Sequence, residues 1–185
     1  MANCFEDTKI ENVDHCPNDE SVGGLAVDLF YVPKDHIDAY LLPVVTPSSK
    51  YVERISLPAN AITLKAQKSW KKISVMVDEN ELTSTLVGNK GNKKSKVEMD
   101  VLIPNFTAKN IGFQDAHKNT PMIFAVADST GQKWVIGTLN APAQFETSDA
   151  KTGKKYDDNS GITGKISANT KLYALQDDIV VEPDV

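Results

Sequence analysis

Two short stretches of the sequence have residue types that bind metal ions. In the first, Asp157-Asp158-Asn159-Ser160-Gly161, oxygen ligands precede a glycine, as at the start of a calcium-binding loop. Lys165 and Ile166 stand where such a loop needs a closing acidic residue, so the pattern favours a solvated turn. The second stretch is poorly spaced for zinc, and its candidate ligands are Cys4, Asp14, His15 and Cys16. We therefore predict neither a metal nor a cofactor.

The sequence also has no catalytic signature. His15, His36 and His117 fall in an acidic segment, a proline-rich connection and a predicted helix end, with no nucleophile motif beside them. Gly88-Asn89-Lys90-Gly91 predicts a turn and not a phosphate-binding loop. We predict that the protein is not an enzyme, although a site assembled from residues distant in the sequence would leave no such motif.

The charges of the chain are segregated. Its 185 residues include 20 Lys and Arg against 25 Asp and Glu, and the net charge of −5 argues against a protein whose main task is to grip phosphates. Acids gather in 1–22 and 177–185, and lysines in 88–96 and 147–164. The loop 88–96 has no aromatic residue to stack on bases, so a solvated hairpin end is preferred over a nucleic-acid contact. A third interpretation is that these segments are complementary patches on copies of the same chain.

Under that interpretation, the two lysine-containing loops supply the candidate inter-subunit contacts. They are Lys90, Lys93, Lys94, Lys96, Lys154, Lys155, Asp157 and Asp158.

Strand-sized segments separated by turn residues predict an all-β fold. The first strand, Leu25 to Val32, ends at Pro33, which has no N–H to continue a ladder. Residues 33–58 contain several prolines and predict an ordered connection with one helical turn over Asp35 to Leu41. The further predicted strands are Ile62 to Ser69, Lys72 to Asp78, Glu81 to Val87, Lys96 to Ile103, Met122 to Asp128, Lys133 to Leu139, Ala143 to Ser148, Gly161 to Ala168 and Lys171 to Leu175.

Some of these segments alternate between apolar and other residues, which is typical of half-buried antiparallel strands. The alternating apolar positions are Ile73, Val75 and Val77 in one segment and Val97, Met99 and Val101 in another.

Two local features complete the predicted elements. Residues 128–132 predict a hairpin turn, with Gly131 free to adopt a positive φ. The segment between Pro104 and Pro121 predicts one helix, with Thr107 as its N-cap and with Ile111 and Phe113 facing the sheet.

Together these features predict a mainly β protein, an antiparallel β-barrel or sandwich with one short flanking helix and long loops and arms. The single domain spans 23–176, between an extended acidic N-terminal arm at 1–22 and an acidic tail at 177–185. The loops 88–96 and 147–164 are expected to project from it.

We expect no membrane association. The longest uncharged stretch, 39–49, contains prolines and polar residues and cannot provide the roughly 20 apolar residues of a membrane-spanning helix. The first residues lack the basic start and apolar stretch of a secretory signal, so we expect a protein that stays inside the cell that makes it.

One family-like pattern lies in the second half of the chain. It comprises 121–128 (PMIFAVAD), 131–138 (GQKWVIGT), 143–145 and the loop with Asp158-Asn159-Ser160-Gly161, followed by a final strand. Together these resemble the C-terminal half of phage tail tube, or major tail, proteins. The opening is similar to the starts of structural proteins from phages and prophages of Bacteroidales-type hosts, through Cys4, Asp14-His15-Cys16 and Gly23-Gly24-Leu25.

The resemblance implies a virion structural protein that assembles into a hexameric ring, with rings stacked as a tube for genome passage. Its partners are then copies of itself and other tail proteins, with DNA only as non-specific passing cargo. Its location is the virion tail, after assembly in the bacterial host cytoplasm. Glu98 and Asp100, on the polar face opposite Val97 and Met99, become candidate lumen-facing acids, although an ordinary solvated sheet face explains them equally well.

Two alternatives stay open. The proline-rich connection departs from the tube pattern, which leaves room for another tail role, a head-completion role or capsid decoration. A different class is a β-sandwich module that binds carbohydrate or a host surface. Its candidate contact residues are Tyr31, Tyr40, Tyr51, Trp70 and Trp134.

Overall fold

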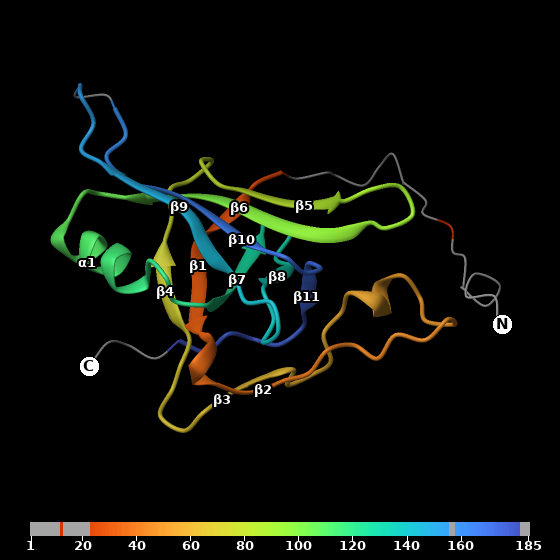
Figure 1. The fold of residues 1–185 in the computed structure, drawn as a ribbon. Coiled ribbons are helices and arrows are strands. Elements are labelled where there is room, and N and C mark those ends of the chain that lie inside the picture. Colours follow the sequence, from red (N-terminus) through yellow and green to blue (C-terminus); the bar gives the residue numbers. More distant parts are fainter. Residues whose placement is uncertain (1–11, 13–22, 156–157, 182–185) are drawn as a thin grey trace.

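The computed structural model describes residues 12, 23–155 and 158–181. The predictions for most of the N-terminal arm, for Asp157 and for the tail beyond Val181 lie outside this part. Two antiparallel sheets pack face to face as a sandwich, and neither closes into a barrel (Figure 1). The predicted mainly β, sandwich-type fold is therefore confirmed.

The larger sheet has five strands in the order β11-β8-β7-β1-β4. Its strands are β1 (Leu25–Pro33), β4 (Lys71–Ser74), β7 (Met122–Asp128), β8 (Lys133–Ile136) and β11 (Tyr173–Leu175). The smaller sheet has four strands in the order β5-β6-β10-β9. Its strands are β5 (Glu81–Val87), β6 (Lys94–Pro104), β9 (Gln144–Lys151) and β10 (Gly161–Ala168).

The remaining elements surround this sandwich. A small two-stranded sheet pairs β2 with β3, and helix α1 lies at one side of the sandwich (Figure 1). Their bounds, with those of two 3-10 turns, are η1 (Lys34–His36), β2 (Ile37–Tyr40), η2 (Val52–Arg54), β3 (Ile62–Leu64) and α1 (Ala108–His117).

The first core fills the space between the two large sheets. The alternating residues of β6 point into it, and Val97, Met99 and Val101 are all buried, as predicted. The five-stranded sheet contributes Phe124 and Leu29 from the opposite side. Removing this apolar surface from water provides most of the driving force for the packing.

A second core lies on the other face of the five-stranded sheet. Ile123 and Ala125 of β7 point into it, where they meet Leu57 and Ile37. β7 is therefore buried on both faces, which explains why its sequence is a continuous apolar run without alternation.

Much of the cover over this second core is formed by the proline-rich connection and β3. The predicted helical turn over Asp35 to Leu41 is wrong beyond residue 36, because a 3-10 turn at Lys34–His36 leads directly into β2. Tyr40 then fixes β2 to the sheet, because its hydroxyl donates a hydrogen bond to the Gly137 carbonyl oxygen at 3.2 Å.

Helix α1 begins as the sequence predicts. The Thr107 hydroxyl accepts a hydrogen bond from the Asn110 N–H at 3.2 Å, which satisfies one of the open donors of the first turn. Phe113 packs against the first core, edge-on to Tyr31 at 5.4 Å between ring centroids and to Phe145 at 6.1 Å. Ile111 is only half-buried.

Several predicted strands end earlier than their apolar pattern suggests. The segment from Ile62 leaves the sheet after Leu64, at a turn in which Gln67 has φ +61°. β4 ends at Ser74, and Val77 is 60% exposed instead of buried. β8 stops at Ile136, and β11 begins only at Tyr173.

Both predicted loops are shorter than expected. β6 begins at Lys94, so the hairpin tip is confined to 88–93. β9 continues to Lys151, so the second loop spans only 152–160. Both strands extend into polar sequence because pairing between strands is made by backbone hydrogen bonds, which form with polar and apolar side chains alike.

The predicted turn at 128–132 is confirmed, and the Asp128 carboxylate organises it. Its Oδ1 accepts hydrogen bonds from the Thr130 N–H, the Thr130 hydroxyl and the Gln132 N–H, and its Oδ2 accepts one from the Trp134 Nε1–H at 2.8 Å. Partial burial opposes ionisation, but these bonds outweigh it and lower the pKa of Asp128 below its ordinary value.

Asp128→Asn should therefore destabilise the protein by about 1–2 kcal/mol, since the turn loses charge-assisted hydrogen bonds but is partly exposed to solvent. Because the folded-state pKa is lowered, this stability is present above about pH 4 and is lost as the pH falls further. Denaturant unfolding of both proteins between pH 3 and 7 measures it. Asp115→Asn, at an exposed helix position, is the matched control and should change little; a pH-independent Asp128→Asn deficit would contradict the assignment.

Candidate functional site

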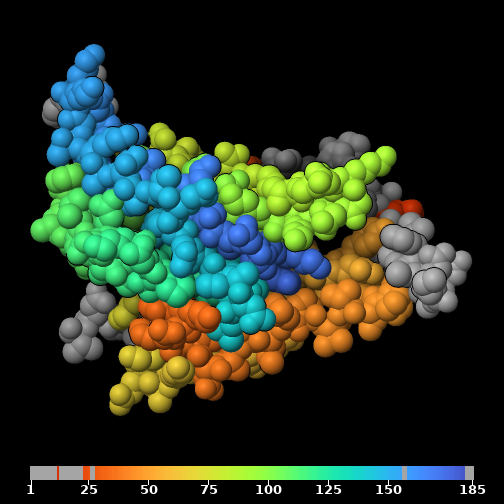
Figure 2. All heavy atoms as spheres, in the orientation of Figure 1, coloured from red at the N-terminus to blue at the C-terminus, as the bar shows by residue number. Residues whose placement is uncertain are grey.

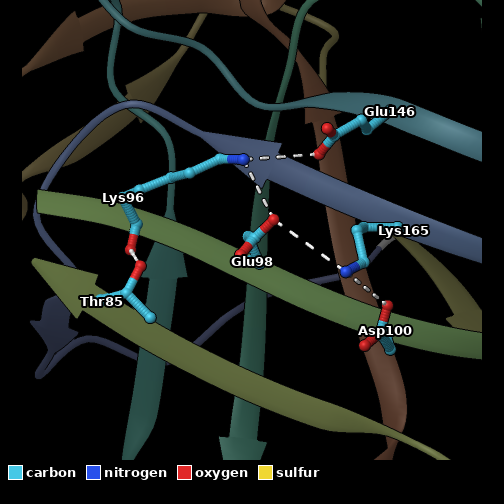
Figure 3. A network of polar contacts seen from close by, with 6 residues as sticks. All are labelled: Thr85, Lys96, Glu98, Asp100, Glu146 and Lys165. Carbon is cyan, nitrogen blue, oxygen red and sulfur yellow. Dashed lines mark hydrogen bonds and ion pairs between the residues drawn. The ribbon is translucent and has the colours of Figure 1, made fainter. Parts of the chain in front are cut away.

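The solvent face of the four-stranded sheet has an ordered network of opposite charges (Figure 3). Lys96 Nζ lies 3.0 Å from Glu98 Oε1 and 3.7 Å from Glu146 Oε2. Lys165 Nζ lies 3.7 Å from Asp100 Oδ1 and 4.0 Å from Glu98 Oε1. Lysines and carboxylates thus alternate across β6, β9 and β10.

Strand register explains this arrangement. Lys165 is the direct cross-strand partner of Asp100, and Glu98 is one step away along the same face of β6. Opposite charges at such positions stabilise a sheet modestly. The hydrogen bond from Lys96 is the main cause that lowers the pKa of Glu98, and the same bond raises the pKa of Lys96.

The two predicted lumen-facing acids therefore lie on the polar face, as expected, but each has a lysine beside it. Glu98 is 26% exposed and Asp100 is 54% exposed. The face is nearly balanced in charge and is not a continuous acidic surface. The lysines that balance it come from the same strand and from β10, and the sequence prediction did not include Lys165.

The structure separates seven of the eight candidate contact residues into two groups, and the eighth, Asp157, lies outside the described residues. Lys90 and Lys93 are exposed in the tip 88–93, and Lys94 and Lys96 follow in β6. Lys154, Lys155 and Asp158 lie in the loop 152–160 at the other end of the molecule, as Figure 1 and Figure 2 show. The two groups therefore cannot form one contact surface on a single copy.

Asp158 has a structural role in the loop 152–160. Asp158 Oδ2 accepts hydrogen bonds from the Lys154 and Lys155 N–H groups at 2.8 and 2.9 Å, which closes a turn. Among residues 23–155 and 158–181, no cluster of His, Cys, Asp or Glu has the arrangement of a metal site. The residues considered for zinc and not predicted to bind it, Cys4, Asp14, His15 and Cys16, lie outside the described residues.

Most side chains considered for other functions take part in packing. His117 packs edge-on to Tyr31 and tilted against Phe113, and burial lowers the pKa of His117. Trp70 is buried, and Trp134 is half-buried with its N–H bonded to Asp128. The aromatic residues considered for glycan contacts thus do not form an exposed platform: Tyr31 and Tyr40 are half-buried, and Tyr51 is exposed.

Strand β5 is an open sheet edge that the sequence prediction missed. Among the described residues, it has a strand neighbour on one side only. From Leu82 to Val87 it contains no charged residue, proline or glycine. Charged side chains, prolines and bulges are the usual protection of an edge strand against pairing with another chain.

The other three edges are protected. β4 has Lys71 and Lys72, and β11 is bridged by Ser56 of the neighbouring segment. β9 contains charged residues and has a register irregularity opposite Lys165 and Ile166. The uncharged run 82–87 could have been noticed in the sequence, but only the pairing of distant strands makes it an edge.

The exposed apolar surface of the β2–β3 loop, residues 41–61, is a second feature that the sequence prediction missed. Its backbone is held by Arg54, whose guanidinium donates hydrogen bonds to the carbonyl oxygens of Ser49, Thr46 and Pro47 at 3.3–3.4 Å. Large apolar side chains nevertheless face solvent along it, and Val44 is 88% exposed. The exposed set is Leu41, Leu42, Val44, Val45, Tyr51 and Val52.

Comparisons with known proteins identify no relative: no family model, curated protein or solved structure matches this chain. In the part of the chain that the structure describes, no helix has the length and apolar character needed to cross a membrane.

Lys96→Met should raise the pKa of Glu98 toward the ordinary glutamate value of about 4.3, because it removes the hydrogen bond that lowers this pKa. Titration of the Glu98 side-chain carboxyl by NMR measures the change. Lys118→Met is the matched control, because it removes the partner of Asp115 and should leave Glu98 unchanged. An unchanged Glu98 pKa in Lys96→Met would show that the network does not persist in solution.

Proposed function

We propose that this protein is a structural, self-assembling virion protein of the phage tail tube type. In this proposal its copies join edge to edge into rings, and the rings stack into a tube through which DNA passes as non-specific cargo. The protein would be made in the bacterial host cytoplasm and incorporated into the tail with other tail proteins. The resemblance of the sequence suggests six copies in a ring.

The observation that carries the proposal is the unprotected edge of β5. A seven-residue strand that is uncharged from Leu82 to Val87, with unpaired backbone groups along one side among the described residues, is a template for another strand. The other three edges of the two large sheets are protected, so the lack of protection at β5 stands out. Pairing with another copy would satisfy these backbone groups.

The two edges of the four-stranded sheet have the strand directions that a repeated, head-to-tail contact needs, although the charges and the register irregularity of β9 make its edge the more protected of the two. All its strands are antiparallel in the order β5-β6-β10-β9, so β5 and β9 run in opposite directions. The β9 edge of one copy can therefore continue the antiparallel alternation beyond β5 of the next. A contact between two different edges repeats around a ring when the rotation closes.

The solvent face of this sheet is compatible with a channel for DNA. Its alternation of Lys96, Glu98, Lys165 and Asp100 leaves no strong excess of one charge. A surface of clustered lysines would bind phosphates and hold the DNA, whereas a balanced face would not. The exposed apolar side chains of the β2–β3 loop, on another part of the molecule, would then contact neighbouring copies.

Ser84→Lys tests the proposed ring contact. Ser84 is exposed although it lies opposite buried Val97 on the core-facing side of β5, so a lysine there fits the monomer but obstructs an added strand. We expect the concentration needed for ring formation to rise at least about tenfold, equivalent to about 1.4 kcal/mol. Light scattering after size-exclusion chromatography and negative-stain microscopy measure the assembly.

Ser74→Lys is the matched control, because it makes the same change at an exposed position on β4, which already has two lysines. Rings should form normally in this variant. A wild-type protein that stays monomeric at high concentration would contradict the proposal. A closed dimer through two β5 edges would also contradict it, because such a dimer leaves no edge for a ring.

A further inference from the structure

The β5–β6 hairpin has opposite charges at its two ends. Three exposed acids lie where the chain enters β5, Asp78 and Glu79 before the strand and Glu81 as its first residue, and they are here called the acidic turn. The far end of the hairpin contains Lys90, Lys93 and Lys94, also exposed, here called the basic tip. The nearest members of the two groups are Glu81, the first residue of β5, and Lys94, which lies opposite the last residue of β5, so about 20 Å separates them at about 3.4 Å per residue.

This separation prevents the two groups from neutralising each other within one copy. It is about two and a half times the Debye length of about 8 Å at physiological ionic strength. Like charges instead lie together at each end. Glu81 is the direct cross-strand partner of Asp100, and two acids at such positions destabilise a sheet. Lys165 Nζ, 3.7 Å from Asp100 Oδ1, offsets part of this repulsion, and a basic partner from outside the chain would offset more of it.

Exposed apolar side chains accompany each charged group. Val77, next to the acidic turn, is 60% exposed. Leu86 and Val87, next to the basic tip, are 68% and 42% exposed. Each end thus has an apolar part beside a charged part, which is the usual composition of a protein interface with an apolar centre and a polar rim.

We propose that the basic tip of one copy binds the acidic turn of another copy, so that molecules stack head to tail along the β5–β6 hairpin. The partner is a second copy because the same chain presents both complementary surfaces. A contact between two different surfaces leaves each of them open at the ends of the stack, so it can repeat without closing. This inference rests on the proposed function, in which it supplies the contact between successive rings.

Charge reversal of each surface gives two variants for the test. The reversed-tip variant is Lys90→Glu, Lys93→Glu and Lys94→Glu. The reversed-turn variant is Glu79→Lys and Glu81→Lys with Asp78→Asn, because Asp78 has φ +60° and asparagine tolerates that conformation. Each variant alone places like charges against each other. In a 1:1 mixture, every tip again meets a turn of opposite charge.

We expect each variant alone to form rings but to need about a hundredfold higher concentration to form tubes, and the mixture to regain tube formation. Tube length by negative-stain microscopy measures this. Raising the salt from 0.15 M to 1 M should shorten wild-type tubes, because the Debye length falls to about 3 Å. Lys65→Glu with Lys68→Glu is the control, since it reverses two exposed lysines between β3 and β4, outside the candidate contact residues.

The same variants in a Ser84→Lys background separate this inference from the ring proposal. At concentrations below those at which the Ser84→Lys protein forms rings, sedimentation analysis should detect association of reversed-tip with reversed-turn molecules but not of either with itself. If wild-type rings fail to form but this mixed association occurs, the ring proposal is wrong and the head-to-tail contact stands. If the single variants form tubes like the wild type, or the mixture associates no better than either variant, the head-to-tail contact is wrong.

Discussion

Burial of β7 on both faces is the constraint on which the rest of the structure depends. Met122, Phe124 and Val126 pack toward the four-stranded sheet, and Ile123 and Ala125 pack the other way. A strand of this composition is stable only if the sheet around it has two covers. The four-stranded sheet is one cover, and much of the other is the proline-rich connection with β3. The prolines thus belong to a segment with a packing role.

The sequence was sufficient for features determined by neighbouring residues. The alternation at 97–101, the turn at Asp128 and the N-cap at Thr107 all depend on side chains within a few residues of one another. Strand ends were harder to predict, because pairing partners decide where β4 stops and how far β9 extends. From the sequence alone, an apolar residue such as Val77 is predicted to continue the strand, because the sequence does not show where the partner strand ends.

The candidate site depends even more on distant pairing. Glu98 and Asp100 are visible in the sequence, but the lysine that lies between them comes from β10. The open edge of β5 and the separation of its charged ends follow from the order of strands in the sheet. Sequence reasoning could identify charged loops, and only the fold could show that two of them lie at opposite ends of the molecule.

Through the β2–β3 loop, the stability of each molecule depends on whether neighbouring copies bind to it. Leu57 and Ala61 at one end of the loop are part of the second core, while Val44 and Val52 face solvent. Any partner that binds the exposed side chains also holds this cover against the sheet. The partner therefore stabilises the folded state, as a ligand does. In the proposed assembly, the isolated subunit would therefore be the least stable form of the protein, and each added neighbour would make its fold more resistant to unfolding.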